Sequence, residues 1–236
     1  MKHLDLPSTP YDLGIIKQFF WAESLILDQY NQQQLVEESP IKFSIKTLLT
    51  VATIEKKNRI LPGGILYDFN SNQYSSVYHG EKFKPEFPYI PSLLSIRHKL
   101  PLLGTIERFL GEFDLLLVEG GGLQHPRFFG LACEIGVDLD VPTIGITKRG
   151  LCGTVDFTKL VTLESDDTPT HEVYPVWYTD RIVAYFIRKK GNRKGMFLSV
   201  GHQTTLASVV SKLIPLLIHR KPEPLRLLKR HLRKKM

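Results

Sequence analysis

A short apolar run that ends on a charged residue and three glycines constrains the fold of this chain more than any other feature. The run covers residues 115–118, and Glu119 and the glycines 120–122 follow it directly. A helix-like stretch and a second apolar run, 141–146, come next. Strand, glycine turn, helix and strand in this order are typical of a parallel βαβ unit. The sequence therefore predicts an α/β fold built on a central sheet.

Polar residues that could take part in binding or catalysis follow both apolar runs. Glu119, His125 and Arg127 come after the first run, and Lys148 comes after the second. In open α/β sheets, ligands bind at the carboxyl ends of the parallel strands. We therefore expect these four side chains to gather at one edge of the sheet and to form the functional surface.

The residues before the βαβ unit predict helices and an antiparallel meander. Helical spacing of apolar residues favours a helix over 11–38, ended by Ser39 and Pro40. Strand-like runs separated by turn residues then follow, at 47–54, 64–69 and 74–78. A helix over 92–110, interrupted near Pro101, leads into the unit.

The residues after the unit continue the same domain. The pattern favours two strands within 173–186, a strand at 195–200 and a helix over 206–218. Neither an internal repeat nor a linker is visible, so we expect one domain over 1–236.

Composition places the chain among ordinary globular proteins. Of its 236 residues, 42% are hydrophobic, which is enough for a full core. No apolar run reaches the roughly 20 residues that a membrane span needs, and the amino terminus lacks a secretory h-region. We expect a cytoplasmic monomer without a membrane partner, in which Cys133 and Cys152 are buried thiols rather than a disulfide.

The formal net charge of +7 comes from one end of the chain. Residues 219–236 hold eight Lys and Arg against one Glu, and the remaining residues are balanced at 23 basic and 23 acidic. A basic tail of this kind suits phosphate backbones or anionic surfaces. A solvated helix whose cations favour its carboxyl end explains the same charges. Both interpretations stay open.

Several segments together resemble the endonuclease V family. They are the turn of Pro88, Tyr89, Ile90 and Pro91, the stretch 118–127 with its three glycines and His-Pro-Arg, and the stretch 140–153 with Lys148. The order and spacing of these segments carry the resemblance, which covers about residues 40–225. It implies an RNase H-like fold, a mixed central sheet flanked by helices. It also implies cleavage of DNA or RNA near a deaminated base, typically inosine, with Mg²⁺ or Mn²⁺.

The resemblance further implies roles for individual residues. The turn from Pro88 to Pro91 would act as a wedge that carries Tyr89 outward between bases. Lys148 would contact the scissile phosphate, and His202 would complete the active site. The remaining candidates for nucleic-acid binding are three glycines and two basic residues, namely Gly120, Gly121, Gly122, His125 and Arg127.

The expected metal ligands are altered in this chain. The three family carboxylate positions appear here as Thr53, His98 and Glu119, so only Glu119 is predicted to bind a metal. Mg²⁺ requires oxygen ligands, preferably carboxylates, whereas a histidine suits Zn²⁺ or Mn²⁺ better. Glu55 lies two residues from Thr53, on the same strand face, and is a candidate for the missing carboxylate.

These substitutions leave three functions open. The first is a nucleic-acid-binding homologue whose phosphodiester hydrolysis is weakened or lost, because a metal supplies most of the rate acceleration in such sites. The second is a working nuclease with a site rebuilt from Glu119, Glu55 or His98. The third is a non-catalytic interaction scaffold that uses the basic tail.

Overall fold

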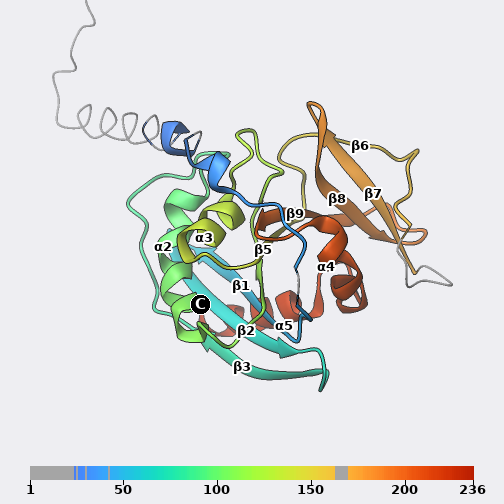
Figure 1. Ribbon diagram of the computed structural model, residues 1–236. Helices are drawn as coiled ribbons and strands as arrows, with labels where there is room; N and C mark the ends of the chain where they lie inside the picture. Colours follow the sequence, from blue (N-terminus) through green and yellow to red (C-terminus); the bar gives the residue numbers. More distant parts are fainter. Residues whose placement is uncertain (1–23, 25, 30, 42, 163–169) are drawn as a thin grey trace, which may run out of the picture.

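The computed structural model describes residues 24, 26–29, 31–41, 43–162 and 170–236. Within these residues, nine strands form one sheet in the order β3-β2-β1-β4-β5-β9-β8-β7-β6 (Figure 1). The strands are β1 Thr47–Lys56, β2 Arg59–Asp68, β3 Gln73–His79, β4 Leu115–Val118, β5 Thr143–Thr147, β6 Thr154–Val155, β7 His171–Tyr178, β8 Arg181–Lys189 and β9 Gly195–His202. This mixed sheet confirms the predicted α/β class.

The centre of the sheet is parallel. Strand β4 pairs in parallel with β1 and β5, and the helix α3 (Leu131–Leu139) connects β4 to β5, so the predicted βαβ unit is confirmed. Val51 is level with Val118, which in turn is level with Gly145. The residues that follow these three strands therefore reach the same edge of the sheet.

Antiparallel hairpins extend the sheet on both sides. Strands β1, β2 and β3 form the predicted meander, and strands β9, β8, β7 and β6 form the other half. Strand β2 begins at Arg59 rather than at residue 64, because Pro62 lies beyond the last pair with β3 and costs no hydrogen bond there. Lys57 and Asn58 both have positive φ, as a two-residue type I′ hairpin turn requires.

The predicted helices are present with shifted ends. Helix α2 (Ser95–Ile106) contains Pro101 without interruption and continues into the 3₁₀ turn η2 (Glu107–Phe109). Helix α4 (Leu206–Leu213) continues into η3 (Ile214–Leu216). The described residues between 24 and 32 are helical and lead into η1 (Gln33–Leu35). Residues 11–23 of the expected amino-terminal helix lie outside the described residues.

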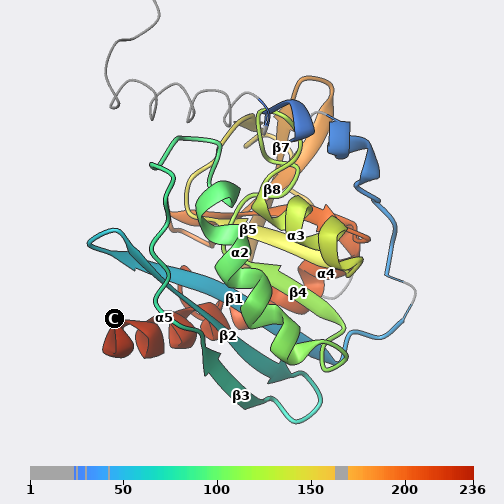
Figure 2. The ribbon, with the colours of Figure 1, turned by 90° about the vertical axis from the view of Figure 1, so that its left-hand side faces the viewer.

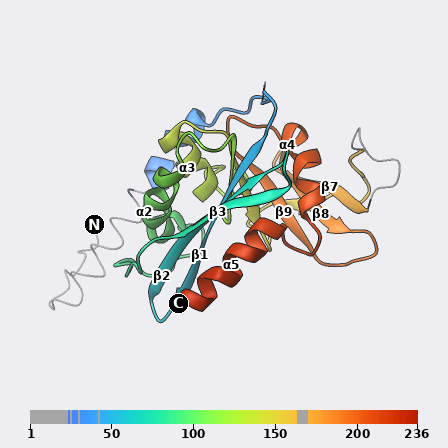
Figure 3. The same cartoon turned by 90° about the horizontal axis from the view of Figure 1, so that it is seen from below.

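Helices cover both faces of the sheet. Helices α2 and α3 pack on one face against Leu49, Val51 and Leu116, as Figure 2 shows from the side of α2. The other face carries Leu48 and Leu117, among others, and is covered by α4 and the final helix α5 (Glu223–Lys235) (Figure 3). The parallel centre of the sheet is thus buried on both faces, as parallel strands require.

The carboxyl-terminal residues form part of the core. Leu225, Leu228 and Leu232 of α5 are fully buried, and a Cβ on Gly63 of β2 would lie 2.7 Å from Leu232 Cδ2. Leucines three and four residues apart form an apolar stripe, which docks the helix on the sheet while its charged residues face outward. From Glu223 on, the expected basic tail is therefore a docked helix with three cations in its last turn, as the second interpretation of these charges predicted.

Two other expectations concern the thiols and the membrane. Cys133 is buried, Cys152 is half-buried, and both are free thiols, as predicted. Among the described residues, no helix combines the length and the apolar composition needed to cross a bilayer.

Candidate functional site

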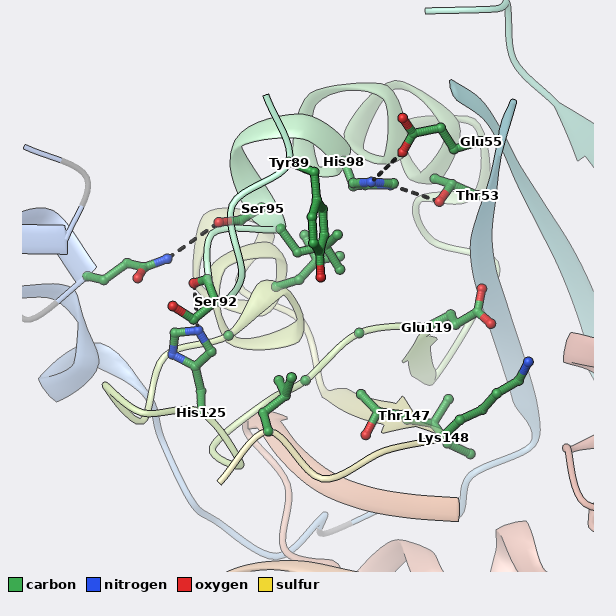
Figure 4. Close-up of a pocket in the computed structure, with 18 of the residues that line it drawn as sticks. Thr53, Glu55, Tyr89, Ser92, Ser95, His98, Glu119, His125, Thr147 and Lys148 are labelled. Carbon is green, nitrogen blue, oxygen red and sulfur yellow. Dashed lines mark hydrogen bonds and ion pairs between the residues drawn. The ribbon is translucent and has the colours of Figure 1, made fainter. Parts of the chain in front are cut away.

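A cavity of about 400 Å³ opens at the carboxyl edge of the parallel strands (Figure 4). Its wall comes from the ends of β1, β4 and β5, from the segment that leads into α2, and from α5. The residues that line it include Thr53, Glu55, Tyr89, Ser92, His98, Glu119, Gly120, Gly121, His125, Lys148 and Lys229. The structure thus brings most of the predicted site residues together.

Glu119 lies at the centre of a charged cluster. Its backbone N–H donates to Val51 O at 3.0 Å, which fixes the residue against the end of β1. Lys229 Nζ, from α5, donates to Glu119 Oε2 at 2.5 Å, and Lys221 Nζ lies 3.7 Å from Oε1. The three side chains are between 15% and 19% exposed. Two ammonium groups of the chain therefore occupy the surroundings of the carboxylate.

Lys148 joins the same cluster from the end of β5. Its side chain is exposed and extends toward the same side of the cavity as Glu119 (Figure 4). Burial lowers the pKa of Lys221 to about 8, Glu119 opposes that shift, and the charges of Lys229 and Lys148 add to it. Burial is thus the main cause of this lowered pKa, and the charges of the two neighbouring lysines add to it.

The second carboxylate of the cavity, Glu55, is also paired within the chain. The buried Arg97 of α2 donates from Nη2 to Glu55 Oε1 and from Nη1 to the carbonyl of Phe87. Arg97 thus holds the Glu55 carboxylate against α2, where it is already paired with a cation of the chain.

His98 and Thr53 are neighbours in the cavity wall. Thr53 Oγ1 lies 2.8 Å from His98 Nδ1, and His98 Nε2 lies 3.7 Å from Glu55 Oε2 (Figure 4). Burial lowers the pKa of His98 to about 4, although Glu55 opposes the shift. The imidazole is therefore neutral at pH 7.

These residues do not fit Mg²⁺. Mg²⁺ requires several oxygen ligands in octahedral geometry, and both nearby carboxylates already bind cations of the chain. The described residues contain no group of three His, Cys, Asp or Glu side chains placed to hold a metal. The predicted role of Glu119 as a metal ligand has no support in this geometry.

Tyr89 projects from the predicted wedge. Its side chain is 63% exposed between the exposed residues Pro88 and Pro91, and its ring extends into the cavity (Figure 4). Ile90 is half-buried, and its carbonyl accepts from the N–H of Leu93 to close the turn. An exposed ring on a closed, proline-flanked turn can stack on a planar ligand.

His125 and Arg127 support this turn from below. His125 Nε2 lies 2.9 Å from Ser92 O, and the carbonyl can only accept, so the proton sits on Nε2. Burial lowers the pKa of His125 to about 4, which keeps its imidazole neutral. Arg127 is buried, donates from Nη2 to Ser92 O at 2.6 Å and donates from Nε to Gln29 Oε1 at 2.6 Å. Both residues position the turn, and Arg127 does not line the cavity.

The glycines after β4 serve packing as well as access. A Cβ on Gly122 would lie 1.9 Å from Val200 O of β9, so no other residue fits there. Gly120 and Gly121 are buried and line the cavity. Gly122 is thus required for packing against β9, and Gly120 and Gly121 form part of the cavity wall.

His202 does not belong to this site. Strand β9 runs antiparallel to β5, and His202 pairs with Thr143 at the start of β5. It therefore lies at the opposite edge of the sheet, where its Nδ1 accepts from Glu37 N at 3.2 Å. The predicted catalytic role of His202 is therefore wrong for this geometry. The prediction failed because the direction of β9 could not be inferred from the sequence.

Two lysines of the site, Lys221 and Lys229, were not among the residues predicted from the sequence. They lie in the basic segment that was interpreted as a tail. The leucine spacing of residues 225–232 was the available signal, since it predicts a docked helix.

Comparison with known proteins identifies the family. The fold is RNase H-like, and it superposes on the catalytic domain of human endonuclease V with a TM-score of 0.76 at 19% identity, covering 91% of this chain and 95% of that one. Endonuclease V from Ciona intestinalis, solved with DNA containing an inosine, gives 0.75 at 17% identity, covering 91% and 97%.

Sequence comparison agrees with the structural one. The chain is 30% identical over 198 residues to endonuclease V of Thermofilum pendens, covering 83% of this chain and 80% of that protein. It is 29% identical over 218 residues to the Dictyoglomus thermophilum protein, covering 92% and 91%. The sequence model of the endonuclease V family matches residues 30–230. The chain belongs to the endonuclease V family.

Proposed function

We propose that this protein binds a nucleic-acid strand in the cavity but hydrolyses it weakly or not at all. The observation that carries the proposal is the pairing of both cavity carboxylates with cations of the chain itself, Glu119 with Lys229 and Lys221, and Glu55 with Arg97. Family membership and the DNA-bound Ciona relative support nucleic acid as the ligand.

The charges explain why hydrolysis is lost. Around Glu119 the chain places three ammonium groups, from Lys148, Lys221 and Lys229, against one carboxylate. Two unit charges 4 Å apart interact by about 4 kcal/mol at an effective dielectric of 20, so this cluster repels a dication. Without a metal, the water that attacks a phosphodiester is not activated and the developing charge is less stabilised.

The binding surface is nevertheless complete. Tyr89 offers a ring on a rigid turn, and the backbone of Gly120 and Gly121 lines a cavity large enough for a base. Stacking on an aromatic ring accepts any base, so the cavity walls must select the base that enters. By family resemblance that base is the hypoxanthine of inosine, in DNA or RNA.

A nicking and binding assay tests the proposal. A labelled strand with a single inosine is incubated with the protein in Mg²⁺ and then in Mn²⁺, and binding is measured on the same strand at several salt concentrations. We expect salt-sensitive binding without cleavage, because groove contacts to phosphates release counterions. Cleavage in Mg²⁺ that is abolished by Glu119→Ala would contradict the proposal.

One observation favours a rebuilt nuclease as the second candidate. His98 is neutral and lies 3.7 Å from a Glu55 oxygen, which gives a nitrogen and an oxygen for Mn²⁺. Cleavage that requires Mn²⁺ and disappears in His98→Ala would support this candidate. Absence of any salt-sensitive binding would instead favour the interaction scaffold.

A further inference from the structure

We propose that Lys148, Lys221 and Lys229 form a binding site for one phosphate group of the nucleic-acid backbone, with Lys229 standing where a nuclease needs its metal ion. This inference rests on the proposed function, since the phosphate belongs to the strand bound in the cavity. It adds two residues, Lys221 and Lys229, that neither the sequence analysis nor the family resemblance assigned to the ligand.

The three lysines come from separate elements that the fold holds together. Lys148 follows β5, Lys221 lies in the connection between η3 and α5, and Lys229 lies on α5. Arg220 Nη2 donates to Lys148 O at 3.1 Å and Arg220 Nε to Gly195 O at 3.0 Å, which ties the end of β5 to the segment that carries Lys221. The buried leucines next to Lys229 fix the third position.

Glu119 acts as the positioning residue for two of these lysines. Its two oxygens face different ammonium groups, Oε2 toward Lys229 and Oε1 toward Lys221. Each ammonium has three N–H donors, so one contact to Glu119 leaves donors for a ligand. The carboxylate thus orders two cations without consuming their hydrogen-bonding capacity.

The charge balance of the cluster favours an anion. Three positive charges face one negative charge, and the nearby acidic residue of α5, Glu223, is paired with Arg226. A phosphodiester carries one negative charge and accepts several hydrogen bonds, and lysine binds phosphate as a compact point charge. Phosphate binding would therefore relieve the repulsion among the lysines.

The cluster accounts for binding without cleavage. An ammonium group can neutralise a phosphate oxygen, but it offers no exchangeable coordination position at which water is activated, as a metal does. The same residues that hold the backbone therefore leave the phosphodiester intact.

Matched lysine variants test the site. Lys221→Met and Lys229→Met each remove one ammonium group and keep an unbranched side chain. Lys234→Met is the control, because Lys234 is exposed near the end of the same helix. Binding of the single-inosine strand is measured at several salt concentrations. We expect each cluster variant to weaken binding about tenfold. The negative slope of log K against log salt should become shallower by up to about 0.7. The binding constant of the control should stay within about twofold of that of the unaltered protein.

A second measurement uses inorganic phosphate as the probe. Thermal unfolding of the full chain is followed in phosphate and in chloride at equal ionic strength. We expect phosphate to raise the melting temperature of the unaltered protein and of Lys234→Met, and to raise it less in Lys221→Met and Lys229→Met. Each variant serves as its own reference, so a variant of lower stability still reports phosphate binding.

The outcomes separate the inference from the proposed function. Strand binding that the two cluster variants affect no more than the control overturns the phosphate site and leaves the proposed function standing. A phosphate response that depends on Lys221 and Lys229, without any strand binding, supports the site and overturns the proposed function. A phosphate response equal in all four proteins overturns the site.

Discussion

Docking of α5 sets the position of Lys229, so the first prediction concerns the helix itself. Leu228 is fully buried, and its Cδ1 lies 3.2 Å from where a Cβ on Gly63 would be, in contact with the backbone of β2. A backbone contact of this kind cannot collapse to fill a cavity. Leu228→Ala therefore loses the transfer free energy of the side chain and leaves a void, for a cost of about 3 to 5 kcal/mol.

Urea unfolding followed by circular dichroism measures this cost. Lys234→Ala serves as the control on the exposed face of the same helix and should stay within about 0.5 kcal/mol of the unaltered protein. We also expect Leu228→Ala to weaken strand binding, because Lys229 is the next residue in the chain. A loss below about 1 kcal/mol would mean that α5 is not docked and would remove the basis for the lysine cluster.

Two further predictions test the electrostatics of the cavity. Lys229→Asp leaves two lysines against two carboxylates, so we expect Mn²⁺ binding to appear, detected by the electron paramagnetic resonance of free Mn²⁺; an unchanged signal would contradict the charge argument. The pKa values of His98 and His125 are about 4 in the fold against 6.5 in the unfolded chain, so the unfolded chain binds more protons between these values. The free energy of unfolding should thus fall as pH falls from about 6.5 to 4, and His98→Asn and His125→Asn should each make this pH dependence less steep. A pH dependence as steep in both variants as in the unaltered protein would refute the assignment.

The sequence predicted the part of the fold that local pattern encodes. The apolar runs at 115–118 and 141–146 with their glycine turn gave the βαβ unit, and the rule for strand ends placed Glu119 and Lys148 at one edge. The Pro88–Pro91 turn also predicted the exposed ring of Tyr89. These features depend on short stretches of chain, where residue type and spacing largely decide the structure.

The missed features depend on contacts between distant segments. A single strand pattern carries no direction, so His202 was assigned to the wrong edge of the sheet. The leucine stripe of residues 225–232 predicts a helix, but not the sheet face on which it docks. Lys229 therefore could not be placed beside Glu119, a residue 110 positions away, without the three-dimensional structure.

The cation beside Glu119 is covalently part of α5, and this sets how the site responds to its surroundings. A bound Mg²⁺ exchanges with the solvent and leaves when a chelator is added. The ammonium group of Lys229 stays at the site because it is attached to the chain. Occupancy of the site is therefore independent of metal supply. At neutral pH, the protein loses this cation by chemical modification of the lysine or by undocking of the helix.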